Sequence, residues 1–340
     1  MVVAMVAAVV SVAEPAEDIP VGYDYANMKT LAPFLHEVHY TADYVCATYS
    51  AISENPSTNA AFACSAVRKG NFLGRNFDYL LDDVPTFIVR MDAAKGRLAS
   101  VGVSQQWEMH EDGVTNGQYT AAYGRVPLMM LDGVNECGVA VENNVVPVDD
   151  CGVLTGTNPG APDLNISYVL RYVLDHATNA AHGVELVKSR NLVGDIGGYC
   201  YLHYMIADKD ETYVVEIVTN TVVSRHMDIM TNFNLNWDNG NRCAISDANS
   251  NGWAVADYPV PYDTNVTTNE IDRRYSPGSS GVERFVVLRE NLDRYEDSLE
   301  GMFGLMRNVQ YTKLAAEDAD PFWLSEFFVG SAYRGIVREV

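Results

Sequence analysis

This sequence is poor in basic residues. Only 23 of its 340 residues are Lys or Arg, against 45 Asp and Glu, so the formal net charge at pH 7 is −22. A surface with that charge repels phosphate backbones and anionic membranes, so we expect neither nucleic acid as a partner nor stable membrane insertion of the mature domain. One arginine can still dominate a pocket, so small anionic substrates are not excluded.

Cysteine is sparse, and the motifs of several common sites are missing. None of the six cysteines belongs to a Cys-x-x-Cys pair, which argues against a structural zinc site. Their number is also too low for a disulfide scaffold. The chain has no HExxH, no GxGxxG and no phosphate-binding loop. Zinc-protease, dinucleotide and P-loop chemistry are therefore not indicated.

The apolar run at the N-terminus is short. Residues 1–13 cannot span a bilayer as a helix, but they have the size of the apolar region of a signal peptide, with Ser11-Val12-Ala13 suited to cleavage. No Lys or Arg precedes the run, so a buried strand or helix remains an alternative. A signal segment would make the protein secreted or part of the cell envelope; otherwise we expect it to be cytoplasmic.

The most informative stretch of the sequence is residues 63–79. Small and apolar residues lead up to Cys64, and a Lys-Gly-Asn turn follows at residues 69–71. After the turn, residues 72–78 fall into two alternating sets, as the two faces of a β-strand do. This pattern predicts a β-hairpin with Cys64 on its first strand and Arg75 and Asp78 on its second. Cross-strand neighbours lie about 5 Å apart, so a thiol, a guanidinium and a carboxylate would meet there.

The rest of the chain predicts a mixture of strands and helices. Helical spacing of apolar residues occurs within residues 24–53, 166–177, 183–188 and 282–295. Strands or hairpins are expected within 86–91, 100–103, 131–148, 201–207, 213–218 and 222–225. Helices do not alternate with strands as a parallel βαβ sheet requires. We therefore predict an α+β fold with two antiparallel sheets between helix layers.

The order Cys-Ser, short turn, Gly-Arg-Asn-Phe-Asp-Tyr resembles the mature start of the choloylglycine hydrolase family. These linear-amide hydrolases use an N-terminal cysteine nucleophile, and they include bile salt hydrolases and penicillin V acylases. The resemblance runs from about Tyr23 to the C-terminus. It implies a four-layer αββα sandwich of the N-terminal-nucleophile hydrolase type. It also implies a leader at residues 1–63, with an apolar segment and a helical pro-segment, and an amidase domain at residues 64–340.

Three later segments resemble the same family in the same order. A Val-Ala-Val-Glu-Asn-Asn strand implies an oxyanion-hole role for Asn144, or for Asn143 after a slip of one residue. A Met-Thr-Asn-Phe segment implies that Asn232 holds the substrate or the oxyanion. A Ser-rich turn followed by Arg-Phe implies a second active-site arginine at Arg284.

The resemblance implies a mechanism that needs no metal and no organic cofactor. Cys64 would attack the amide carbonyl and form a thioester, and its own α-amine would act first as base and then as acid. A free α-amine has a pKa of about 7.7–8, so it could accept the thiol proton near neutral pH. This requires cleavage of the Ala63–Cys64 bond. In this mechanism Asp78 would hold the amine and Arg75 would stabilise the thiolate. Asn144 and Asn232 would bind the oxyanion, and Arg284 would complete the polar network.

The substrate is expected to be a small amide, of the acyl-amide, penicillin V or conjugated bile salt type. Apolar side chains between the hairpin and the Asn144 strand could line an acyl pocket, or could equally be core. They are Trp107, Tyr119, Tyr123, Met129 and Met130, with Asn143 as a polar neighbour. The family resemblance also allows a homo-oligomer.

Each candidate residue has a simpler explanation. Cys64 could be a buried, inert thiol. Arg75 and Asp78 could form a surface ion pair, and Asn143 and Asn144 could shape a turn. Asn232 could close a loop, and Arg284 could be an exposed helix residue. Their occurrence in the family's order favours the enzyme. The sequence departs from bile salt hydrolases in two ways. The gap of 11 residues from Cys64 to Arg75 is shorter, and the 63 residues ahead of Cys64 are more than those enzymes carry. In these respects it is more like the relatives described only as linear amide C–N hydrolases. An acyltransferase on this scaffold and a non-catalytic binding protein with unprocessed Cys64 remain as alternatives.

Overall fold

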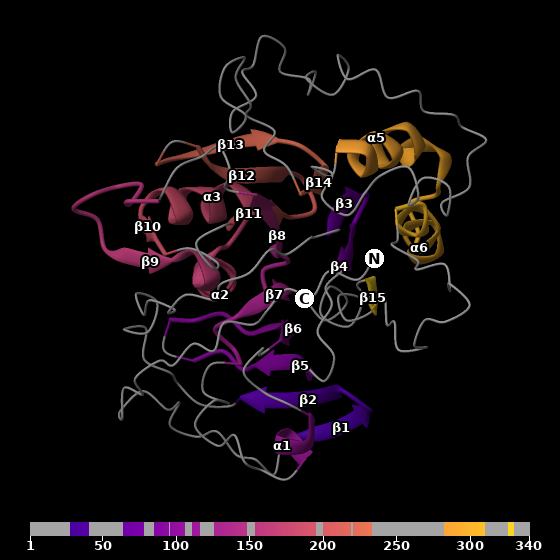
Figure 1. Cartoon of the computed structure of the whole chain (residues 1–340), viewed down its shortest axis with the longest axis horizontal. Coiled ribbons are helices and arrows are strands. Elements are labelled where there is room, and N and C mark those ends of the chain that lie inside the picture. The colour runs from indigo at the N-terminus through magenta and orange to yellow at the C-terminus, as the bar shows by residue number, and fades with distance from the viewer. Residues whose placement is uncertain are drawn as a thin grey trace.

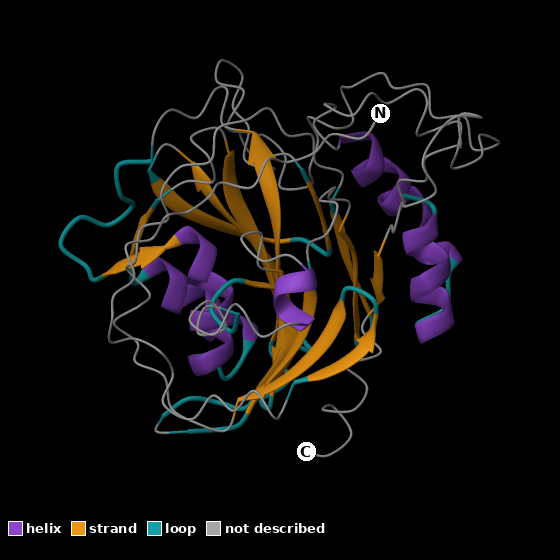
Figure 2. Cartoon of the chain, turned by 60° about the horizontal axis from the view of Figure 1, so that its bottom comes forward, coloured by secondary structure: helices purple, strands orange, loops and turns teal. Residues whose placement is uncertain are grey.

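The computed structural model of the chain describes eleven segments. They are residues 28–40, 64–77, 85–94, 96–105, 111–115, 126–147, 154–194, 200–218, 220–232, 282–309 and 326–329. Their strands form two main sheets, which lie between two groups of helices (Figures 1 and 2). The larger sheet has the order β1-β2-β5-β6-β7-β8-β11-β12-β13, and the smaller has the order β14-β3-β4-β15.

The larger sheet is mostly a meander of antiparallel neighbours. Its strands are β1 (Lys29–Ala32), β2 (Leu35–Tyr40), β5 (Thr86–Met91), β6 (Ser100–Gln105), β7 (Met130–Asn135), β8 (Ala140–Pro147), β11 (Cys200–Ala207), β12 (Thr212–Val218) and β13 (Thr221–His226). The strands predicted from the sequence in this region are confirmed. One pairing differs from the prediction: β2 and β5 run parallel. The sheet is therefore mixed rather than purely antiparallel.

The smaller sheet contains the predicted hairpin. β3 (Ser65–Lys69) and β4 (Phe72–Phe77) pair antiparallel around a turn in which Gly70 has φ +56°. Cys64 comes directly before β3 rather than within it, and Asp78 lies outside the described residues. β14 (Ile229–Thr231) pairs with the other edge of β3, and β15 (Glu326–Val329) pairs with β4. The nucleophile candidate thus precedes a central strand of this sheet.

The first helix layer covers the outer face of the larger sheet. It consists of α2 (Val169–His176) and α3 (Ala180–Lys188), which contact β7, β8, β11 and β12. The predicted helical spacing over 166–177 is confirmed: the turn η4 (Ile166–Tyr168) precedes α2, and Asn165 caps that turn by accepting a hydrogen bond from the backbone N–H of Ser167. A short parallel pair, β9 (Asp163–Asn165) and β10 (Asn191–Val193), lies beside these helices, and α1 (Glu111–Thr115) lies near β1 and β2 (Figure 1).

The second helix layer covers the outer face of the smaller sheet. α5 (Val282–Asn291) contacts β14 and β3, and the turn η6 (Leu292–Arg294) leads to α6 (Leu299–Arg307), which contacts β4. The predicted helix over 282–295 is confirmed in α5 and η6. In Figure 2 these helices lie on the opposite side of the strands from α2 and α3.

The inner faces of the two sheets pack against each other. Along β11, Tyr204 and Ile206 belong to the core under α2 and α3, whereas Met205 belongs to the core shared with β3, β14, α5 and α6. This alternation follows from the two-residue period of a strand, because successive side chains point to opposite faces. The layers are therefore helix, sheet, sheet, helix, and the predicted αββα architecture is confirmed.

The chain ahead of Cys64 differs from the sequence prediction. Residues 24–53 were expected to hold one or two helices, but the described part forms strands β1 and β2. On β2 the side chains of His36, Val38 and Tyr40 are buried in alternation, and pairing with β5 overrides the helical spacing of the apolar residues. The boundary at Cys64 between leader and amidase domain stays a prediction. No helix among the described residues is long and apolar enough to cross a membrane.

Candidate active site

The start of β3 presents Cys64 and Ser65 to different layers. Ser65 faces the second helix layer, where its Oγ accepts a hydrogen bond from Arg284 Nε at 3.2 Å. Strand alternation therefore turns Cys64 the other way, toward the larger sheet, on the face it shares with Ala66 and Arg75. Cys64 is buried, with 1% of its surface exposed. Cys64 thus stands at the open end of the hairpin, opposite the β3–β4 turn.

Pairing of β14 with β3 brings Asn232 next to Cys64. Thr231 pairs with Ser65, so the next residue of each strand, Asn232 and Cys64, also lie side by side. Arg284, from the first turns of α5, joins them. Its Nη2 lies 2.6 Å from Asn232 Oδ1 and 3.4 Å from the Cys64 carbonyl oxygen. Three of the residues predicted from the sequence thus form one hydrogen-bonded group.

Asn144 and Asn232 form reciprocal hydrogen bonds between the two sheets. Asn144 Nδ2, on β8, donates to the main-chain carbonyl of Met230 at 3.3 Å. Asn232 Nδ2 donates to the main-chain carbonyl of Val145 at 2.8 Å. Both side chains are buried, and each amide nitrogen has a second hydrogen that these bonds do not use. The pair brings two amide donors to the region of Cys64.

Asn143 lies on the other face of β8. Its neighbours Val141 and Val145 belong to the core under α2 and α3. The Asn143 amide donates to the carbonyl of Met130 at 3.1 Å, and its own main-chain carbonyl accepts a hydrogen bond from Arg75 Nη2 at 2.7 Å. Of the two neighbouring asparagines, Asn144 is therefore the one whose side chain faces the smaller sheet.

Arg75 reaches from β4 across to two carboxylates of the larger sheet. Its guanidinium lies 3.5 Å from Asp132 Oδ2 and 3.4 Å from Glu142 Oε2, and all three side chains are buried. One positive charge cannot neutralise two carboxylates. The pKa of Glu142 is raised to about 8, mainly by burial; Arg75 lowers it and Asp132 raises it within that net shift. The predicted role of Arg75 at the thiolate stays a prediction.

The predicted acyl-pocket residues are mostly outside the described part of the chain. Trp107, Tyr119 and Tyr123 fall there. Met129 is partly buried against the core under α2 and α3, and Met130 is fully within that core. The substrate-binding role of Met129 and Asn143 stays a prediction.

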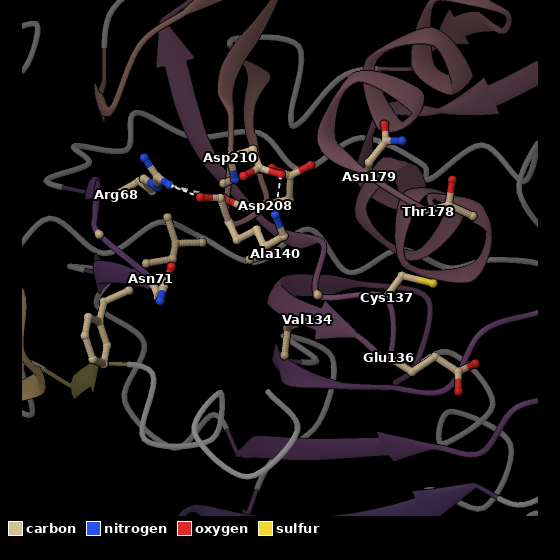
Figure 3. Close-up of a pocket in the computed structure, with 16 residues that line it drawn as sticks. Arg68, Asn71, Val134, Glu136, Cys137, Ala140, Thr178, Asn179, Asp208 and Asp210 are labelled. Carbon is tan, nitrogen blue, oxygen red and sulfur yellow. Dashed lines mark hydrogen bonds and ion pairs between the residues drawn. The ribbon is translucent and has the colours of Figure 1, made fainter. Parts of the chain in front are cut away.

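A cavity of about 350 Å³ opens at the turn end of the hairpin, away from Cys64 (Figure 3). It is lined by the β3–β4, β7–β8 and β11–β12 turns and by residues just before α3. Arg68 crosses its edge and donates to the carbonyl of Lys209 at 2.7 Å. None of the site residues predicted from the sequence lines this cavity.

Several polar residues near the candidate site were missed in the sequence. Asp132, Glu142, His203 and Glu216 are each buried on strands of the larger sheet, and Ser65 binds Arg284. The signal in the sequence was a charged or imidazole side chain within an otherwise apolar strand. Such a side chain is usually buried only when it has polar partners, so it indicates a buried polar group. Among the described residues, no group of His, Cys, Asp and Glu has the arrangement of a metal site.

No family model and no curated protein matches this chain. Among solved structures, the chain is similar to a mutant of conjugated bile acid hydrolase from Clostridium perfringens, with 15% identity, a TM-score of 0.45, and coverage of 72% of this chain and 78% of that one. It is also similar to penicillin V acylase from Agrobacterium tumefaciens, with 17% identity, a TM-score of 0.44, and coverage of 76% and 74%.

Proposed function

We propose that this protein is an amidase that hydrolyses a non-peptide, linear amide C–N bond through a thioester on Cys64. The contact that supports this most is that of Arg284 with both the Cys64 carbonyl and Asn232 Oδ1. It links the nucleophile candidate to an amide donor that stands next to it.

The base in this proposal is the α-amine of Cys64, set free when the Ala63–Cys64 bond is broken. The Cys64 thiol attacks the Ala63 carbonyl, and the acyl group moves from nitrogen to sulfur. Water then hydrolyses this thioester, which leaves a carboxylate on Ala63 and a free amine on Cys64. Before that step the Cys64 nitrogen is an amide, which is not a base.

In each catalytic cycle the thiol proton moves to the α-amine as sulfur attacks the substrate carbonyl. The negative charge on the carbonyl oxygen is then bound by the unused N–H of Asn144 and of Asn232. The leaving amine takes the proton from the ammonium as the C–N bond breaks. Water, deprotonated by the same amine, attacks the thioester and restores the thiol, releasing the carboxylic acid.

Donor orientation is the part of this scheme that the described contacts support in detail. Asn232 Oδ1 is held by Arg284, and one of its N–H groups is held by the Val145 carbonyl. The amide plane is thereby fixed, and its second hydrogen has a set direction. Such preorganised donors stabilise an oxyanion without rearranging during the reaction.

The test is a substrate panel applied to the mature protein and to Cys64→Ala. We expect hydrolysis of at least one of penicillin V, glyco- and tauro-conjugated bile acids, N-acylethanolamines and N-acyl homoserine lactones, and none by the variant. Product analysis with an added amine acceptor distinguishes hydrolysis from acyl transfer. If no substrate is cleaved and iodoacetamide does not label Cys64 near neutral pH, the protein is instead a binding protein on this scaffold.

Maturation is tested separately by mass spectrometry of the intact chain. The wild-type protein should yield a chain that begins at Cys64, whereas Cys64→Ala should stay uncut. A fully active enzyme with an intact Ala63–Cys64 bond would rule out the α-amine as base.

A further inference from the structure

Three buried polar side chains form a row across the larger sheet, beginning with Asn144. His203 on β11 pairs directly with Asn144 on β8. His203 Nδ1 in turn lies 3.5 Å from Oε1 of Glu216 on β12. The three side chains share the face of the sheet that packs against the smaller sheet, as Met205 does on the same strand. Each residue is at most 1% exposed.

The hydrogen-bonding capacity of this row is incompletely used. In the described part of the chain, neither ring nitrogen of His203 has a hydrogen-bond partner, and the same holds for Oδ1 of Asn144. Buried donors and acceptors are costly when left unsatisfied, so native proteins pair nearly all of them. Directly opposed residues on antiparallel strands have Cβ atoms about 4.5–5.5 Å apart. A donor and an acceptor that both lack partners therefore stand side by side.

Asn232 shows what the missing interaction would do. Both asparagines donate one N–H to a carbonyl of the opposite sheet. The Oδ1 atom of Asn232 is held by Arg284, and this fixes the amide plane. For Asn144, the side chain directly opposite on the neighbouring strand is His203, whose ring nitrogens have no hydrogen-bond partner in the described part of the chain.

We propose that His203 is the positioning residue for Asn144, donating from Nε2 to Asn144 Oδ1 either directly or through one bridging water. This rests on the proposed function, since its consequence is the orientation of an oxyanion donor. An imidazole N–H donates, so Nε2–H can hold Asn144 Oδ1 while Nδ1 lies beside Glu216. Hydrogen bonds at an active site are often long without substrate and tighten when it binds, and a bridging water serves nearly as well as a direct bond.

The experiment measures acylation of Cys64 in the mature protein with p-nitrophenyl butyrate, which needs no knowledge of the natural substrate. His203→Met removes both donors and should lower the saturating rate roughly tenfold to a hundredfold, with KM within about twofold. His203→Gln keeps a donor near Nε2 and should restore most of the rate. In an Asn144→Ala background, His203→Met should have no further effect, because the residue acts through Asn144.

A purely structural histidine would give different results. The inference would be overturned if His203→Met folded and kept the wild-type rate. It would also be overturned if the rate losses of His203→Met and Asn144→Ala multiplied in the double variant. Should His203→Met fail to fold because the buried Glu216 loses the imidazole beside it, the double change His203→Met with Glu216→Leu takes its place. Full acylation of Cys64→Ala or a wild-type rate in Asn144→Ala would instead overturn the proposed function, without any His203 variant.

Discussion

Arg284 Nη2 lies 2.6 Å from Asn232 Oδ1, while Nε of the same guanidinium lies 3.2 Å from Ser65 Oγ. One side chain of α5 thus fixes an asparagine that follows β14 and a serine that opens β3. Its donors form a rigid planar fork, which can hold two acceptors in a set geometry. The contact joins the second helix layer to the start of the nucleophile strand.

Replacing Arg284 with lysine should therefore impair catalysis although the charge is kept. An ammonium group is a single point donor and cannot hold Asn232 and Ser65 together. We expect the saturating rate to fall roughly tenfold to a hundredfold, as for other small misplacements of catalytic groups. Arg289→Lys, on the same helix, is the matched control and should keep the wild-type rate. Equal rates for both variants would contradict the prediction.

Asn144→Ala and Asn232→Ala should each lower the saturating rate by about 10²–10³, since each removes one oxyanion donor. Asn143→Ala should mainly lower the thermal stability and have a smaller effect on the rate, because it removes the donor to the Met130 carbonyl. Steady-state kinetics and thermal unfolding of the three variants separate the two neighbours on β8. A larger rate loss for Asn143→Ala than for Asn144→Ala would assign the role to Asn143.

Glu142 should make the folded state less stable as the pH rises. The pKa of its carboxyl is raised from 4.5 to about 8 in the folded chain, by burial first and then by Asp132. Between these values the folded state binds a proton that the unfolded state has released, so stability falls from about pH 4.5 to about pH 8. Glu142→Gln copies the protonated shape and should be more stable than the wild type at pH 8, on the order of a few kcal/mol.

Urea unfolding at several pH values checks this prediction for Glu142. The two proteins should be nearly equal in stability at about pH 4.5 and should diverge as the pH rises toward 8. Glu185→Gln is the control, because that side chain is 72% exposed on α3. Parallel pH profiles for the wild type and Glu142→Gln would show that Glu142 does not carry the extra proton.

Gly74 leaves room for α6 to pack on β4, so Gly74→Ala should destabilise the protein. A Cβ there would lie 2.4 Å from Met302 Sδ and 2.8 Å from Met302 Cγ. Overpacking of a core contact typically costs about 1–3 kcal/mol. Met302→Ala should offset part of that loss when combined with Gly74→Ala, as measured by denaturant unfolding. Strictly additive losses would indicate that Met302 is not the residue that clashes.

Local patterns in the sequence were sufficient to predict the hairpin after Cys64 and the helix over 166–177, whereas the roles of Asn232 and Arg284 were implied only by the family resemblance and stay predictions. Turn chemistry and strand alternation act between neighbours in the chain, so they can be read without a structure. The same local reading failed at β2, where apolar residues at helical spacing are held as a strand by pairing with β5. A pairing partner far along the chain overrides local preference there.

The tertiary structure decided which residues meet. Arg284 and Ser65 are 219 residues apart in sequence and touch only because α5 packs on β3 and β14. The choice between Asn143 and Asn144 depends on which face of β8 meets the smaller sheet, since a shift of one residue reverses the direction of a side chain. Likewise, the raised pKa of Glu142 arises from burial beside Asp132 with one shared arginine. The sequence determined the residue types and their order; long-range packing determined their neighbours, and with them their chemistry.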